Sequence, residues 1–184
     1  MNRKQNQRGR REGGFTLLET MIAMVVLSFG VLSLATVYSQ GLALSNTNQI
    51  QFIAQQKAQQ ALESIFTARN TGYLSWAQIN NVSSQGVFLD GAQPLLAPGV
   101  DGITGTADDD TATPDGVVTG PGADKILGTS DDVQMNLNPW MTRTIVITTD
   151  PNIPNLKNVV ITVNYVFQGK AGSFQLVTAI SAYS

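Results

Sequence analysis

A long stretch without charge near the N-terminus limits what this chain can fold into. Residues 15–44 contain a single charged side chain, Glu19, and residues 20–38 contain neither a charge nor a proline. About 20 apolar residues in a helix span the hydrocarbon core of a bilayer, so the stretch predicts one membrane-spanning helix. A helix buried in a globular domain is the alternative, but the stretch is apolar on all sides and no other segment is suited to wrap it.

Charge is distributed unevenly on the two sides of that stretch. Residues 1–14 carry five basic and one acidic side chain, whereas residues 15–184 carry six basic and twelve acidic ones. A basic segment before an apolar one predicts a cytoplasmic N-terminus and a C-terminal body on the opposite side of the membrane. The body has no basic stripe, so we expect no nucleic acid as a partner.

The chain contains neither cysteine nor histidine. Disulfides, thiolate metal sites and cysteine nucleophiles are therefore excluded, and the commonest general base and metal ligand is missing. No convergent polar motif compensates for these losses. We therefore predict no catalytic residue and do not expect an enzyme.

A specific motif precedes the apolar stretch. Residues 13–19 read GGFTLLE, after a short basic leader, and resemble the N-terminus of type IV prepilins and type II secretion pseudopilins over about 25 residues. The resemblance implies that a prepilin peptidase cleaves between Gly14 and Phe15 on the cytoplasmic side, and that the new amine of Phe15 is methylated. A secretory signal peptide cut near Ser45 is the alternative, but the apolar run exceeds the usual 7–15 residues and contains Glu19.

Glu19 is the charged exception in the apolar helix. A carboxylate in such a place is costly and usually marks a pairing function. After cleavage, the amine of Phe15 is a cation four residues away on the same helix face. The resemblance implies that Glu19 of one subunit pairs with the Phe15 amine of another during assembly. Alternatively, Glu19 lies in the lipid headgroup layer and pairs with nothing.

Helical periodicity continues beyond the membrane segment. Apolar residues recur every three or four positions between residues 50 and 65, with glutamines between them, which indicates an amphipathic helix that ends near Gly72. Strands are expected only near the C-terminus, at 143–149, 158–168 and 173–183, with a hairpin loop at 169–172. The expected fold class is α+β, with the helix packed on an antiparallel meander.

Two copies of an acidic repeat separate the helix from these strands. Residues 98–109 and 121–132 are identical at eight of twelve positions, and residues 99–133 contain eight aspartates and one lysine. Aspartates around a tight glycine turn suit Ca2+, although the spacing is not that of an EF-hand. The alternative is a solvated acidic loop with only local turns. The predicted calcium ligands are Asp101, Asp108 and Asp109 in the first copy and Asp124, Asp131 and Asp132 in the second.

A looser resemblance concerns the C-terminal half. Trp140, Arg143 and Thr144, followed by two strands and the final LVTAIS at residues 176–181, are similar to V-type minor pilins (pilus-modification minor pilins). The resemblance implies a minor structural subunit of a type IV pilus, which an assembly platform inserts among other pilin subunits. A type II secretion pseudopilin, or a binding module such as an adhesin displayed on a pilin helix, stays open as an alternative.

These patterns together predict the organisation of the chain. A cleaved cytoplasmic leader occupies residues 1–14, a membrane and assembly helix 15–44, an amphipathic helix 45–71, and a head 72–184 with an acidic loop at 98–133 and strands at 143–183. The expected location is the inner membrane, in a single pass with the head in the periplasm, and then the pilus at the cell surface.

Overall fold

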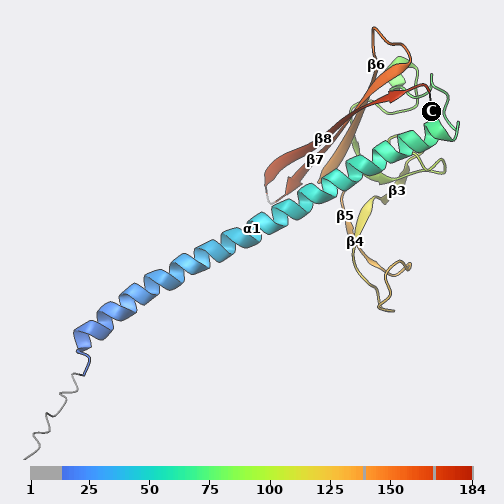
Figure 1. Cartoon of the computed structure of the whole chain (residues 1–184). Coiled ribbons are helices and arrows are strands. Elements are labelled where there is room, and N and C mark those ends of the chain that lie inside the picture. Colours follow the sequence, from blue (N-terminus) through green and yellow to red (C-terminus); the bar gives the residue numbers. More distant parts are fainter. Residues whose placement is uncertain (1–13, 139, 168, 184) are drawn as a thin grey trace, which may run out of the picture. The chain divides into compact units, whose positions relative to one another are not determined.

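The computed structural model describes residues 14–138, 140–167 and 169–183 (Figure 1). The chain divides into two compact units at the boundary between Ser45 and Asn46. Helix α1, Leu17–Asn70, contributes its first part to the first unit and its last part to the second.

The first unit consists of the N-terminal part of α1 and the residues that lead into it. Every described residue of this unit is exposed, and α1 is long and apolar enough, by length and composition, to cross a membrane. The hydroxyl groups of Ser28, Ser33 and Thr36 donate hydrogen bonds to carbonyl groups four residues earlier, at 2.7–3.0 Å. These three hydroxyl groups are therefore satisfied without water, as a lipid environment requires.

The second unit places the last part of α1 against a four-stranded sheet. The strands are β1 (Ala92–Pro94), β6 (Met141–Thr149), β7 (Leu156–Phe167) and β8 (Lys170–Ser181), all antiparallel and in the order β1-β6-β7-β8 (Figure 1). The predicted α+β class and the C-terminal meander are confirmed.

The core lies between the helix and one face of the sheet. On β6 and β7 every second side chain is buried, as the period of a strand requires, and α1 contributes a stripe at helical spacing. Alanine and isoleucine make up most of that stripe. The buried residues of α1 are Ile50, Ile53, Ala54, Lys57, Ala58, Ala61, Ile65 and Ala68.

The end of α1 follows the predicted pattern. The helix ends at Asn70, and Gly72 adopts a φ of +70° in the left-handed region. The Gly72 amide donates to the Arg69 carbonyl at 3.1 Å, and the Leu74 amide donates to the Ala68 carbonyl. A glycine in this conformation ends a helix at little steric cost.

The β7–β8 hairpin is tighter than the sequence predicts. Residues 170–172, which we expected in the loop, belong to β8, and Gly172 pairs with Tyr165 of β7. A side chain at Gly172 would approach the Tyr165 ring to 2.5 Å. Gly172 is therefore a strand residue that makes room for an aromatic ring, not a turn residue.

The structure also contains strands that the sequence does not predict. Besides β1, two hairpins precede β6: β2 (Leu96–Ala97) pairs with β3 (Asp110–Pro114), and β4 (Gly116–Gly120) pairs with β5 (Val133–Asn136). A short 3-10 helix, Val82–Ser84, lies before them. Each copy of the acidic repeat thus forms the loop of a hairpin. The strand pair beside the loop ends at the corresponding position in both hairpins, because Ala97 pairs with Asp110 and Gly120 pairs with Val133.

Candidate functional sites: the processing segment and the acidic repeats

The predicted cleavage site lies immediately before α1. Gly14 and Phe15 are exposed and precede the first helical residue, Leu17. Thr16 caps the helix: its Oγ1 accepts a hydrogen bond from the Glu19 amide at 3.2 Å, which satisfies one of the amides that a helix start leaves unpaired. A side chain at Gly14 would meet nothing within 4 Å. The fold of this chain therefore does not itself require glycine at the predicted cleavage site.

Glu19 is the third residue of α1 and is exposed. A negative charge in the first helical turn interacts favourably with the helix dipole. Among the described residues, the Glu19 carboxylate takes part in no salt bridge. Its pairing with the Phe15 amine of another subunit stays a prediction.

The two acidic repeats have the same internal hydrogen bonds. In the first copy, Asp101 accepts from the Ile103 amide at 2.8 Å, Asp108 from the Asp101 amide at 3.4 Å, and Asp109 from the Gly105 amide at 2.8 Å. The three bonds recur 23 positions later, at 2.8, 3.2 and 2.7 Å. The sequence repeat is therefore also a structural repeat.

In each loop, a glycine near the start lies against the backbone of an aspartate near the end. A side chain at Gly99 would lie 2.2 Å from the Asp108 carbonyl oxygen, and one at Gly122 would lie 2.1 Å from that of Asp131. The left-handed residues also coincide, because Gly102 has a φ of +70° and its counterpart Lys125 a φ of +60°. The loops keep one backbone shape even where lysine replaces glycine.

A threonine fixes the first aspartate of each terminal pair. Thr106 donates its hydroxyl proton to Asp108 Oδ1 at 2.7 Å, and Thr129 does the same for Asp131. These hydrogen bonds lower the pKa of both carboxyl groups below the ordinary value. Both aspartates are thus ionised at neutral pH, and each carboxylate accepts hydrogen bonds within its own loop.

The structure brings the predicted calcium ligands of each copy into one loop, but it turns them toward backbone amides and threonine hydroxyl groups. Among the described residues, no group of three or more acidic side chains is arranged to hold a metal ion. The calcium hypothesis for these six aspartates stays a prediction.

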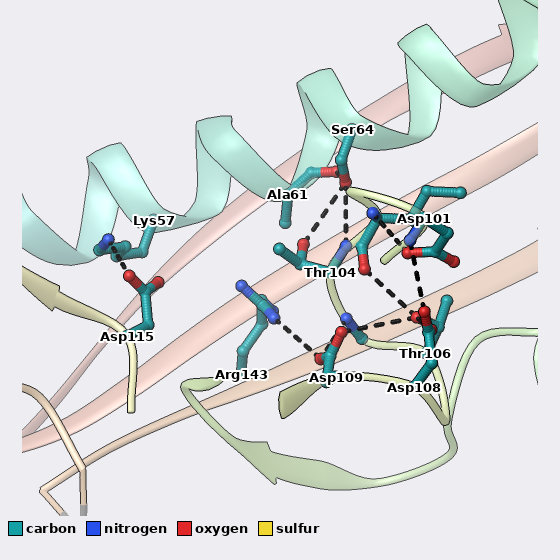
Figure 2. A network of polar contacts seen from close by, with 12 residues as sticks. Lys57, Ala61, Ser64, Asp101, Thr104, Thr106, Asp108, Asp109, Asp115 and Arg143 are labelled. Atoms are coloured by element: carbon teal, nitrogen blue, oxygen red, sulfur yellow. Dashed lines mark hydrogen bonds and ion pairs between the residues drawn. The ribbon is translucent and has the colours of Figure 1, made fainter. Parts of the chain in front are cut away.

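Two buried ion pairs of the head were not predicted from the sequence (Figure 2). Lys57 of α1 lies 2.7 Å from Asp115, and Arg143 of β6 lies with its Nη2 3.9 Å from Oδ2 of Asp109. Both cations occupy positions where the side-chain pattern predicts an apolar residue. Lys57 lies in the buried stripe of α1, and Arg143 lies two residues before Ile145 on the buried face of β6. That placement was the signal available in the sequence.

Burial acts on both members of the second pair. Arg143 is 1% exposed, and burial lowers its pKa, while the charge of Asp109 opposes that effect. Burial also raises the pKa of Asp109, against the Gly105 amide and the Arg143 charge. At a separation of 3.9 Å the attraction does not fully offset desolvation. The pair connects the first loop to β6.

Comparison with known proteins bears on the N-terminal segment. A family model described as the prokaryotic N-terminal methylation motif matches residues 9–35. No curated protein and no solved structure matches the chain significantly. The match includes Gly14, Phe15 and Glu19 and the first part of the apolar helix.

The motif and the fold are both similar to those of one class of protein. The match supports the type IV pilin and pseudopilin family, and the apolar N-terminal helix followed by an antiparallel sheet is a pilin-like arrangement. The motif implies processing by a prepilin peptidase and assembly with other pilins. The N-terminal segment is thus similar to that of membrane-anchored type IV pilin-like and pseudopilin proteins.

Proposed function

We propose that this chain is a minor structural subunit of a type IV pilus, built into the filament through its N-terminal helix. The observation that carries the proposal is the surface of residues 17–45, which are predominantly apolar and all exposed. Within the described part of the chain, nothing covers this surface. Lipid covers it before assembly, and the packed helices of neighbouring subunits replace lipid in the filament.

Location and topology follow from the charges beside the helix. The five basic residues of the leader hold the N-terminus in the cytoplasm by the positive-inside rule. The head is then exported to the periplasm, and assembly carries it to the cell surface. The peptidase acts on the cytoplasmic side, where the exposed Gly14–Phe15 bond precedes the helix.

The minor-pilin role is supported by the C-terminal half. Trp140 donates its indole hydrogen bond to the Asn136 carbonyl at 3.0 Å and lies 6.2 Å from the Phe167 ring, and Arg143 is buried. Trp140 and Arg143, which belong to the resemblance to V-type minor pilins, therefore lie in the packed part of the head. The chain also lacks the cysteines of the C-terminal disulfide loop that many major pilins share.

A type II secretion pseudopilin is the main alternative, because the same N-terminal motif serves that role. The test is to shear filaments from the cells, quantify this chain in them by mass spectrometry, and delete its gene. We expect a small amount of the chain relative to the major subunit, a loss of pili on deletion, and unchanged protein export. Absence from pili together with loss of export would assign the chain to secretion. Retention of both pili and export, with loss of surface attachment alone, would favour the adhesin.

Calcium binding by the repeats has its own test. A bound ion offsets the repulsion within an acidic patch and stabilises the folded head. We expect the detergent-solubilised protein to melt at a higher temperature in millimolar calcium than in sodium at matched ionic strength. Asp124→Asn with Asp131→Asn, in the exposed second copy, is expected to reduce that shift. Equal shifts in the two salts would show that the repeats are acidic loops only.

A further inference from the structure

The two repeat loops share one shape but differ in their surroundings. The first loop, residues 98–109, is built into the core of the head, whereas the second, residues 121–132, is exposed along most of its length (Figure 1). The apolar side chain of Ile103 is 3% exposed, and that of its counterpart Ile126 is 61% exposed. A second apolar residue, Leu127, is 64% exposed beside it, where the first loop has the buried Thr104.

The first loop shows which contacts a loop of this shape can make. Thr104 faces α1, with its Oγ1 3.4 Å from Ser64 Oγ (Figure 2). The Leu89 amide donates to the Gly105 carbonyl at 2.8 Å. Gly105 faces Ile145 of β6 so closely that a side chain there would approach it to 2.7 Å. Asp109 points to Arg143. The first loop thus inserts between a helix and a strand and places its last aspartate beside a buried cation.

The second loop has an isoleucine and an aspartate at the corresponding positions, but among the described residues these side chains lack the contacts with the rest of the head that those of the first loop make. Its base is anchored, because Val117 and Met135 pack against the core and the Gly116 carbonyl accepts from Lys57. At the end of the loop, directly before β5, Asp132 corresponds to Asp109, but it belongs to neither of the two salt bridges of the described residues. Asp132 Oδ1 is shielded from solvent and accepts no hydrogen bond within the described part of the chain. A shielded carboxylate oxygen without a partner is costly.

We infer that the second repeat loop is a docking element that inserts into the head of a different, basic subunit of the same filament, as the first loop inserts into its own head. The inference rests on the proposed function. Ile126 and Leu127 enter an apolar cleft of the partner, and Asp132 pairs with an arginine or lysine beside it. Because Leu127 replaces Thr104, the partner's cleft is apolar where this head has the hydroxyl group of Ser64.

Charge decides between a different subunit and a second copy of this chain. Residues 46–184 contain eleven acidic and six basic side chains. Of the six, Lys57, Arg143 and Lys157 are buried, Arg69 is hydrogen-bonded to Asn70 and to the Ser181 carbonyl, Lys125 belongs to the loop itself, and Lys170 is exposed at the start of β8. A head with an excess of acidic side chains, and with three of its six cations buried, is a poor partner for an acidic loop.

The test uses the full chain in cells that make the filament. A photo-crosslinking amino acid replaces Leu127, and the linked peptides in sheared filaments are identified by mass spectrometry. We expect a link to one different filament subunit, at an apolar segment that contains an arginine or lysine. A link only to copies of this chain, to lipid, or to no protein would overturn the inference.

Substitutions give an independent readout. Ile126→Ser with Leu127→Ser is expected to lower the amount of this chain in filaments at least fivefold, and Asp132→Asn severalfold. Val100→Ser, at a fully exposed position of the first loop, is the matched control and is expected to change nothing. The melting temperature is expected to stay unchanged in the double serine variant, since both side chains are exposed.

The outcomes separate this inference from the proposed function. If the unmodified chain is absent from filaments, both fail. If the unmodified chain is present and the double serine variant is present at the same level, the docking inference fails and the proposed function stands.

Discussion

The two parts of α1 share one backbone but have opposite surroundings. Residues 17–45 are exposed throughout and apolar on all sides, whereas residues 46–70 bury eight side chains in one stripe. A helix satisfies its own backbone hydrogen bonds in lipid and in a protein core alike. The difference therefore lies in the side chains alone. It teaches that the second part is stabilised by its own head, while the first part depends on what lies outside the chain.

The comparison predicts its largest effect at Glu19. Glu19→Val removes a costly charge from the apolar part, so the precursor is expected to enter the membrane at least as well. It is expected to be nearly absent from filaments, because the Phe15 amine of the neighbour is then unpaired in apolar surroundings. Immunoblots of membranes and sheared filaments measure both.

Glu63→Val is the matched control for that variant, since it removes an exposed carboxylate from the packed part of the same helix. It is expected to reach filaments normally. Normal amounts of the Glu19→Val variant in filaments would show that the pairing is unnecessary.

The next largest effect is expected where the packed part holds a buried ion pair. Lys57→Met leaves Asp115 without its cation, and the other carboxylate oxygen of Asp115 is already buried without a hydrogen bond in the described part of the chain. Breaking such a pair costs about 3–5 kcal/mol. Urea unfolding in detergent, followed by the fluorescence of Trp76 and Trp140, reports on the head.

The double variant Lys57→Met with Asp115→Leu removes both charges. It is expected to regain most of the lost free energy of unfolding, because no charge is then left buried alone. A double variant as unstable as the single one would mean that Lys57 acts through packing.

A smaller effect is expected from apolar truncation, and it differs between the two parts. Ile65→Ala removes a fully buried side chain and is expected to lower the free energy of unfolding of the head by about 3 kcal/mol. Leu32→Ala, in the exposed part, is expected to change it by less than about 0.5 kcal/mol. Comparable losses from both substitutions would refute the division of α1 into two parts.

The smallest effect is expected at the start of the helix. Thr16→Ala removes the acceptor of the Glu19 amide and is expected to destabilise the first turn by about 1 kcal/mol. Hydrogen exchange at the Glu19 amide is then expected to be roughly fivefold faster, since local opening governs exchange. Unchanged exchange would mean that the cap does not hold this turn.

Long regular elements were predictable because their side-chain patterns extend over many residues. The apolar stretch and the stripe from Ile50 to Ile65 predicted both parts of α1, and the alternation at 159–163 predicted β7. The strands β1 to β5 were not predictable, since they have two to five residues, too few to show an alternating pattern, and β1, β3 and β4 also contain proline or glycine.

The exposure of the repeats was not predictable from local sequence either. Leu127 is more apolar than its counterpart Thr104, yet Leu127 is exposed and Thr104 is buried. Tertiary contacts with Ser64 and Arg143 decide which copy is docked. The burial of Lys57 and Arg143 was missed for a similar reason, because the acidic partner of each is distant in the sequence.

The mass of the mature protein tests the central claim most directly. Protein extracted from the membrane is expected to begin at Phe15 with a methylated amine, while Gly14→Val is expected to keep its full leader. The Gly14→Val variant is informative because a side chain at that position meets nothing in this chain, so a change in cleavage reflects recognition by the peptidase. A mature N-terminus at any other residue, or cleavage of the Gly14→Val variant at the same bond, would contradict the account.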